Sequence, residues 1–447
     1  MESGNGPINW WSRFVVNRRN WWLPLTIVGV IGLGSMLFVG ARTYQDAPPM
    51  PDFVAKDGSV VVSAEAVVRG QVAFQRYALM DYGSMFGDGA ARGPDFTADA
   101  LHKLAEAMRL HYLVHVSSLP RDMAEATATA RLQQDLKANR YDAASGRVTL
   151  TEAQSFGFTA LLAHYAAMFR GEGDEAFRPA GYISNAQDIE DLTAFFFWGA
   201  WVCSAARPGE AYSYTHNWPY DELAGNRPSP PILYWSVAAA LGLVAVLGFV
   251  LYLYGRYSRL AGWQDDGRRR SVTAAEIDAY TPTRTQRATY KYFAAAAALF
   301  VLQVVAGILT VHDFLGITTW LGVDTSQALP ITVTRGWHLQ LALLWISMCW
   351  FGASIFVLSQ RAAIPAPEQR GLVDVLFLVL VVLTCGTLVG VWAGPLGKLG
   401  GAWRLLGNQG WEFVELGTLW QALMFVAFVL WTVIVVRAVR PQWRAGD

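Results

Sequence analysis

Charged residues are scarce in this sequence: Lys, Arg, Asp and Glu make up 16% of its 447 residues, whereas 53% are hydrophobic. Such a composition is too apolar for an ordinary soluble enzyme, and it is typical of a membrane protein that also carries a sizeable soluble part. Neither sign of charge is in excess, because 35 basic residues balance 35 acidic ones. This balance gives no reason to expect a nucleic-acid partner. Membrane lipid is the expected surrounding.

Cysteine is also rare. The three cysteines, Cys203, Cys349 and Cys385, are far apart in the sequence. No Cys-x-x-Cys-His motif is present, which excludes covalent attachment of a c-type haem to this chain. Two of the three lie in apolar runs, where a free cysteine behaves as a small hydrophobic residue. No disulfide framework can be derived from them.

Long apolar runs, by contrast, are abundant. A helix needs about 20 mostly apolar residues to cross a bilayer. Six runs qualify: residues 22–41, 232–254, 289–311, 337–359, 372–393 and 413–436. Arg13, Arg18 and Arg19 precede the first run, and basic residues of this kind mark a cytoplasmic interface. A cleaved signal peptide would have a shorter apolar part and would end in small residues, so we expect an uncleaved anchor.

The basic residues also predict the orientation of the chain. Seven arginines lie in residues 255–288 and three in the tail after residue 436, so both segments belong on the cytoplasmic side. With six crossings, both ends of the chain are then cytoplasmic. Residues 42–230 are on the outside, and they are numerous enough for a hydrophobic core of their own. Helical periodicity recurs there in residues 99–115, 121–139 and 151–170.

The predicted fold class is therefore mainly α: a polytopic membrane helix bundle of six transmembrane helices with an extracytoplasmic domain. Four parts are expected. They are an N-terminal cytoplasmic segment with its anchor helix (1–41), the outer domain (42–230), a transmembrane helix with a basic cytoplasmic loop (231–288) and a core of four helices (289–447).

A single histidine, His338, lies inside the apolar run that begins at residue 337. An imidazole in the hydrocarbon region costs free energy to desolvate, so a residue of this kind is by default a hypothesis for a functional site. A neutral imidazole nitrogen is a good axial ligand for haem iron, and a transmembrane helix would hold it at a fixed depth. The alternative is a histidine near a helix end, hydrogen-bonded to a carbonyl or to interfacial water. Taken alone, this residue favours the alternative.

Two further polar residues follow an apolar run. His312 and Asp313 come directly after residues 289–311, at the expected outer interface. They could hydrogen-bond the head of a membrane quinol and accept its protons on oxidation. From position alone, an interfacial pair whose polar tips reach water is the more usual arrangement.

Paired acids and paired histidines complete the set of candidates. Glu412 and Glu415 are three residues apart at the expected start of the last helix, so they would share a face. They suit a proton relay or a support for haem propionates, but the positive end of a helix dipole also stabilises such a pair. His111 and His115, four residues apart, could hold a metal, yet no Glu or Cys nearby completes a ligand set. A solvated helix face is favoured for these two histidines.

Several short motifs, individually weak, are specific when taken together. They are Gly70-Gln71-Val72-Ala73-Phe74-Gln75, Asp81-Tyr82-Gly83-Ser84, Gly93-Pro94-Asp95-Phe96-Thr97-Ala98-Asp99, Tyr214-Thr215-His216-Asn217-Trp218-Pro219, Gly225-Asn226, Leu329-Pro330, Arg335-x-Trp337-His338-x-Gln340 and Trp411-Glu412-x-x-Glu415-Leu416-Gly417-x-x-Trp420-Gln421. In these motifs the sequence resembles the N-terminal part of quinol-dependent nitric oxide reductase, a single-chain member of the haem-copper oxidase superfamily. The resemblance runs through the whole chain.

The resemblance implies roles for particular residues. The outer domain would be a cytochrome c-like domain that has lost its haem, and His338 would be one axial ligand of a low-spin haem b. His312 would lie near the quinol site. Glu412 and Glu415 would match paired glutamates beside the haems, and with Arg335 they are candidates for proton relay or for supporting the haem propionates.

The resemblance also implies a reaction and a location. Members of the family reduce two nitric oxide molecules to nitrous oxide with two electrons and two protons, at a high-spin haem that faces a non-haem iron. The implied location is the bacterial cytoplasmic (inner) membrane, with the large domain on the periplasmic side.

Two features depart from the family. A glutamate is expected four residues after His312, and Gly316 occupies that place, so Asp313 is the remaining candidate for the quinol contact. The superfamily core has twelve helices, of which this chain supplies the first four. No histidine follows His338. The second axial ligand and the ligands of the high-spin haem and the non-haem iron are then expected from eight further helices, in a separate polypeptide or in a longer chain continuing past Asp447.

Two other functions remain open. One is a non-catalytic membrane scaffold, or a relic of a split gene, with an extracytoplasmic helical domain. The other is an oxygen-reducing oxidase subunit, which is less favoured because such proteins usually begin directly with the helix core. Since His338 would ligate only one face of the iron, we expect weak haem retention by the isolated chain.

Overall fold

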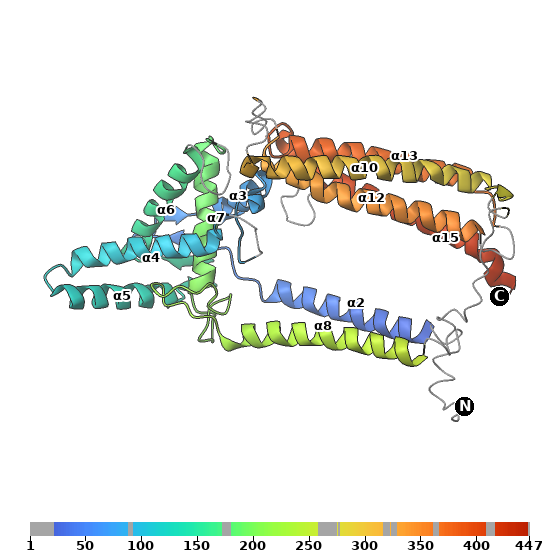
Figure 1. Ribbon diagram of the computed structural model, residues 1–447. Coiled ribbons are helices and arrows are strands. Elements are labelled where there is room, and N and C mark those ends of the chain that lie inside the picture. The colour runs from blue at the N-terminus through green and yellow to red at the C-terminus, as the bar shows by residue number, and fades with distance from the viewer. Residues whose placement is uncertain are drawn as a thin grey trace, which may run out of the picture. The chain divides into compact units, whose positions relative to one another are not determined.

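The computed structural model describes residues 22–87, 93–171, 180–257, 275, 278–315, 322, 329–360, 366–407 and 416–445 (Figure 1). The chain divides into two compact units. The first unit consists of residues 1–49 and 228–280, and the second consists of residues 50–227 and 281–447.

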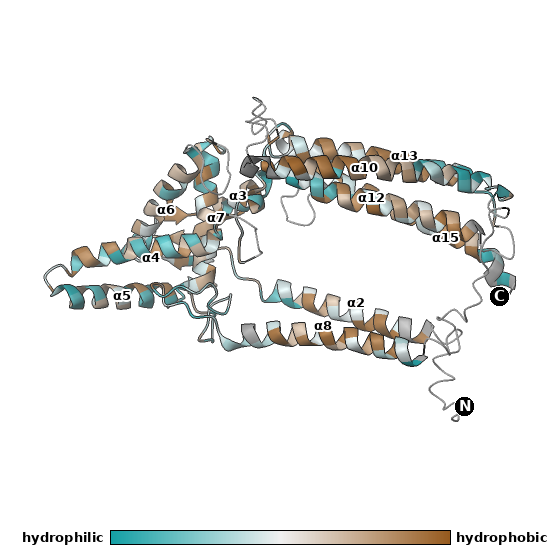
Figure 2. Ribbon diagram, viewed as in Figure 1, coloured by the Kyte–Doolittle hydropathy of each residue, from teal (hydrophilic) through white to brown (hydrophobic). Residues whose placement is uncertain are grey.

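The first unit contributes two long apolar helices, α2 (Trp22–Gln45) and α8 (Pro230–Tyr257). Each holds a stretch long and apolar enough to cross a bilayer, Thr26–Gln45 and Tyr234–Arg256. Their apolar side chains are exposed, as suits helices that face lipid tails. Figure 2 shows hydrophobic residues running along both helices.

The second unit begins with the outer domain, residues 50–227, which is mainly helical. Its elements are β1 (Asp52–Val54), β2 (Val60–Val62), α3 (Ala64–Arg76), η2 (Leu79–Asp81), α4 (Phe96–His115), α5 (Arg121–Lys137), β3 (Tyr141–Asp142), β4 (Arg147–Thr149), α6 (Glu152–Arg170) and α7 (Ala186–Ser204). The strands form one small sheet in the order β2-β1-β4-β3, in which only β1 and β4 are parallel. Strands of two or three residues are too short for an alternating pattern, so the sequence did not predict them.

Side-chain caps explain where the helices of the outer domain begin. Asp95 directly precedes α4, and its carboxylate accepts hydrogen bonds from the Thr97 and Ala98 amides in the first turn of that helix. Thr151 and Gln154 form a reciprocal capping box at the start of α6, and the Asn185 side chain accepts from the Gln187 amide at α7. Each cap satisfies amide groups that a helix leaves unpaired in its first turn.

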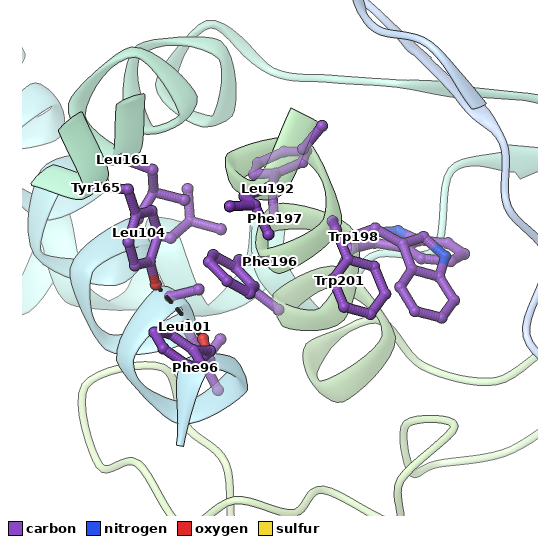
Figure 3. Packing of buried hydrophobic residues seen from close by; sticks show 14 of the residues in the cluster. Phe96, Leu101, Leu104, Leu161, Tyr165, Leu192, Phe196, Phe197, Trp198 and Trp201 are labelled. Atoms are coloured by element: carbon purple, nitrogen blue, oxygen red, sulfur yellow. Dashed lines mark hydrogen bonds between the residues drawn. The ribbon is translucent and has the colours of Figure 1, made fainter. Parts of the chain in front are cut away.

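Aromatic rings fill the core of the outer domain. The rings of Phe96 in α4 and Phe196 in α7 are stacked with their centroids 4.7 Å apart. Tyr165 of α6 packs on Phe196 at 4.8 Å, and Phe53 of β1 and Phe158 of α6 contact the neighbouring Phe197. Figure 3 shows how α4, α6 and α7 converge on these rings. Helix α7 is thus the central element of this domain.

The rest of the second unit is a bundle of four long helices. They are α10 (Arg284–Leu315), α12 (Ile331–Gln360), α13 (Arg370–Ala393) and α15 (Thr418–Ala445), with η3 (Gly400–Ala402) and the short α14 (Trp403–Leu406) between the last two. Helix α10 lies along α12, and α15 packs on α13. Their apolar side chains, among them Tyr292, Leu344 and Leu380, form one buried cluster.

The predicted fold class is confirmed. Six helices in the part of the chain that the structure describes are long and apolar enough to span a membrane, and the protein is a mainly α, multi-pass membrane protein. The ends of the helices differ from the prediction. Helix α12 begins at Ile331 rather than residue 337, because polar and apolar residues alternate in its first turn and hide it from a hydropathy pattern. Helix α15 begins at Thr418, and residues 413–415 of the predicted run lie outside the described residues.

Candidate functional site

The helix that carries His338 begins inside the outer domain. Ile331, in the first turn of α12, belongs to the same buried cluster as the aromatic rings of α7. Val333 and Thr334 are also fully buried. Pro330, whose ring is compatible with a helix start, precedes them. The outer domain therefore fixes the N-terminal end of α12.

An ion pair reinforces this junction. The Arg335 guanidinium donates to the Asp81 carboxylate, which ends η2 in the outer domain. The Asp81 side chain is 2% exposed and that of Arg335 is 20% exposed. A carboxylate buried to this degree is costly unless a cation neutralises it. The pair lies one turn ahead of His338 on α12.

The His338 ring makes one defined hydrogen bond, to the backbone of α10. Its Nδ1 atom lies 2.9 Å from the Gln303 carbonyl oxygen. Because a carbonyl oxygen can only accept, Nδ1 carries the proton, and Nε2 of the neutral ring keeps its lone pair. Among the described residues, the hydrogen bond of the His338 ring is made by Nδ1 and not by Nε2. A histidine whose second ring nitrogen is held in this way is the usual arrangement of a metal ligand.

A glycine on α10 makes room for the ring. A Cβ atom at Gly307 would lie 2.9 Å from Nδ1 and 3.0 Å from Cε1 of His338. Real Cβ atoms do not approach ring atoms this closely, so the position of the ring depends on the missing side chain. One turn before Gly307, the Gln303 side-chain oxygen accepts a hydrogen bond of 2.6 Å from Trp345 Nε1.

A cavity of about 270 Å³ lies farther along α12, between this helix, α13 and α15. It is mostly apolar, with Leu344, Leu380 and Met424 in its wall. Gln340 also borders it, and the two polar atoms of the Gln340 side chain are buried without a hydrogen-bond partner in the described residues.

The other predicted site residues lie largely outside the described part of the chain. His312 and Asp313 belong to the last turn of α10, but their side chains are not described. Gly316, Glu412 and Glu415 are outside the described residues, and the described part of the last helix starts after both glutamates, at Thr418. Their predicted roles remain predictions.

Polar clusters in the outer domain do not form a metal site. His111 and His115 of α4 have ring centroids 4.5 Å apart, and the His115 Nδ1 atom contacts the His111 carbonyl. No group of three or more His, Cys, Asp or Glu side chains arranged to hold a metal occurs among the described residues.

One cluster in the outer domain affects ionisation. The Asp99 carboxylate accepts a hydrogen bond from the Tyr165 hydroxyl and lies 2.9 Å from His164 Nε2. Burial by itself would raise the pKa of Asp99, but the hydrogen bonds and charge of its partners outweigh burial and hold that pKa below its ordinary value. The cluster ties α4 to α6.

Sequence reasoning missed three residues of the site. Asp81 lies in one of the motifs of the resemblance, but nothing in the sequence joined it to Arg335, which is 254 positions away. Gln303 gave a weak signal, as an amide side chain within an apolar run. Gly307 gave none, because glycine is common in transmembrane helices.

Comparison with known proteins identifies the outer domain. Residues 51–220 match the family of cytochrome c-like domains of NorB, a nitric oxide reductase protein. No curated protein matches the chain. Residues 51–220 thus form a domain related to the cytochrome c-like domain of NorB, and through it the chain is a multi-pass membrane protein related to this nitric oxide reductase protein.

Proposed function

We propose that this chain is the electron-accepting portion of a quinol-dependent nitric oxide reductase, in which His338 is one axial ligand of a low-spin haem b. The observation that carries the proposal is the hydrogen bond from His338 Nδ1 to the Gln303 carbonyl, which leaves the Nε2 lone pair for a metal. The family match of the outer domain supports the choice of reaction.

The residues present fit one side of a haem b site. His338 offers a neutral Nε2 lone pair, the ligand that haem iron takes from a protein. Arg335, one turn away, is the candidate that the resemblance gives for supporting a haem propionate, and Asp81 holds its guanidinium in place. When bound, haem b accepts and passes on one electron at a time. The ring, its carbonyl partner and the ion pair would hold the group at the outer end of α12.

Further roles are proposed for residues whose side chains the structure does not describe. His312 and Asp313, at the end of α10, would bind the quinol head and accept its protons. Glu412 and Glu415 would relay protons. A high-spin haem and a non-haem iron would be held by eight further helices, on a separate polypeptide or in a longer chain. We place the protein in the bacterial inner membrane, with the outer domain on the periplasmic side.

The aromatic core of the outer domain is relevant to whether this domain could hold a haem. Phe96, Phe196 and Phe197 occupy the centre of the domain with 2% exposure or less. No Cys-x-x-Cys-His motif is present to attach a haem. We propose that this domain acts by fixing α12 and not by carrying electrons.

The experiment is to co-express the chain with the polypeptide that supplies the remaining helices and to measure gas consumption with a reduced quinol analogue. The proposal predicts that nitric oxide is consumed and nitrous oxide formed, and that both are lost when this chain is omitted. Consumption of oxygen instead would favour an oxidase. Activity that persists without this chain would identify it as a scaffold and contradict the proposal.

A further inference from the structure

We infer that α10 is a positioning element for the His338 imidazole: the Gln303 carbonyl fixes its tautomer, and the missing side chain of Gly307 leaves that carbonyl open to it. The inference rests on the proposed function, because it assumes that Nε2 of His338 binds iron. Gln303 and Gly307 are positioning residues and do not touch the ligand position.

The spacing of the two residues explains why glycine is needed. In an α-helix the carbonyl of residue 303 points toward the amide of residue 307, and the side chain of residue 307 leans back over that same turn. Any Cβ at position 307 would therefore stand between the carbonyl and an outside donor. The measured distance agrees, since this Cβ would lie 2.9 Å from the His338 Nδ1 atom that the carbonyl binds.

Gln303 contacts α12 at a second point. Its side-chain oxygen accepts from Trp345, seven residues after His338 on the same face of α12. The Trp345 ring also packs edge-on against Phe300 of α10, with centroids 5.5 Å apart. Two hydrogen bonds, two helical turns apart, fix the register of α10 on α12. The carbonyl bond orients the imidazole ring, and the Trp345 bond links the two helices beside it.

The consequence for a bound iron is electronic. A carbonyl that accepts a hydrogen bond from Nδ1–H makes the opposite nitrogen more electron-rich, so the ligand favours ferric over ferrous iron. Loss of this bond should raise the midpoint potential of the haem and loosen its attachment. Partners of metal-bound histidines typically change metal affinity by about 10–100-fold. Simple helix packing would produce neither effect.

The test compares four variants in the complex that holds haem, one of which is His338→Ala. Gly307→Ala should displace the ring from the carbonyl, raise the midpoint potential, shift the low-spin signal in electron paramagnetic resonance and weaken haem retention by about 10–100-fold. Gln303→Leu removes the bond to Trp345 but keeps the backbone carbonyl, so its resonance signal should stay as in the parent. Gly248→Ala in α8 is the matched control, because a Cβ there meets no atom within 4 Å.

The outcomes separate the inference from the function on which it rests. If His338→Ala keeps the low-spin signal, the proposed function fails. If His338→Ala abolishes the signal but Gly307→Ala leaves potential, spectrum and retention unchanged, only the positioning inference fails.

A second measurement covers the case in which Gly307→Ala does not assemble. In the haem-free chain labelled with ¹⁵N-histidine, the His338 signals are assigned by their loss in His338→Gln. Nitrogen shifts of an Nδ1-protonated ring would support the inference, and those of an Nε2-protonated ring would overturn it.

Discussion

Asp81 and Arg335 form an ion pair between the outer domain and the helix of the candidate ligand. Neither residue could be assigned a partner from the sequence, because the contact exists only after the outer domain has folded onto α12. The sequence did single out His338, because an ionisable residue is conspicuous in an apolar run, and the resemblance added Arg335.

Removal of Arg335 should destabilise the outer domain, because the buried Asp81 carboxylate is then left without a cation. With Arg335→Met, Asp81 stays 2% exposed and loses its cation, so we expect the outer domain to lose about 3–5 kcal/mol of stability. The double variant Asp81→Asn/Arg335→Met should regain much of this loss, because no charge is then left unpaired.

The rate at which the Cys203 thiol is modified measures how often the outer domain opens. The Cys203 side chain is fully buried in α7, and burial raises the pKa of its thiol to about 12, so it reacts only when the domain opens. In a background with Cys349→Ala and Cys385→Ala, thiol modification should be fast in the single variant and slower in the double. Arg121→Ala, which breaks an exposed pair with Glu125, is the control and should cost well under about 1 kcal/mol. Equal rates in all variants would contradict the account of this ion pair.

Asp99 should make the outer domain sensitive to acid. Its folded pKa lies below the ordinary value of 3.8, so its stabilising effect is complete above that pH and is lost as the pH falls through the folded pKa. Asp99→Asn should lower stability at neutral pH by about 1–3 kcal/mol through its hydrogen bonds and should flatten the profile below pH 4. Denaturant unfolding measured against pH is the measurement, because thiol modification needs the thiolate and is too slow in acid. A parent-like profile in Asp99→Asn would refute the prediction, and Asp122→Asn on α5 is the exposed control.

At the scale of elements, the long apolar helices could be predicted from sequence and their starts could not. An apolar run of this length forms a transmembrane helix because a helix satisfies its backbone hydrogen bonds within the segment. The first turn of α12 was not predicted, because its burial comes from the outer domain. Thr332 and Thr334 are polar by type but 1% exposed or less. Hydropathy reports the chemistry of a residue, whereas packing decides its surroundings.

The contact between α3 and α7 depends on Gly70. A Cβ atom there would lie 1.9 Å from the Asp191 carbonyl oxygen, and a backbone atom cannot move aside as a side chain can. Gly70→Ala should therefore cost about 3 kcal/mol, the upper end for overpacked cores, or more. It should speed modification of Cys203, whereas Val68→Ala, at an exposed position of the same helix, should change it little. If both variants behaved alike, the close helix contact would not matter for stability.

At the scale of the whole molecule, composition and apolar runs were sufficient to predict a multi-pass membrane protein with a folded outer domain. The small sheet, the aromatic core around α7 and the burial of the first turn of α12 needed the structure, because each joins segments far apart in the sequence. The site shows the same limit. Its donor, His338, was visible in the sequence, while the carbonyl and the glycine that hold it became visible only when α10 lay against α12.

The central claim is that His338 binds haem b, and a reduced-minus-oxidised visible spectrum of the detergent-purified complex tests it most directly. The parent chain, co-expressed with the remaining helices, should show a low-spin haem b band, and the chain alone should show little or none. His338→Ala should abolish the band, while His115→Ala, on the exposed end of α4, should keep it. A full band in His338→Ala, or no haem in the assembled parent complex, would contradict the account.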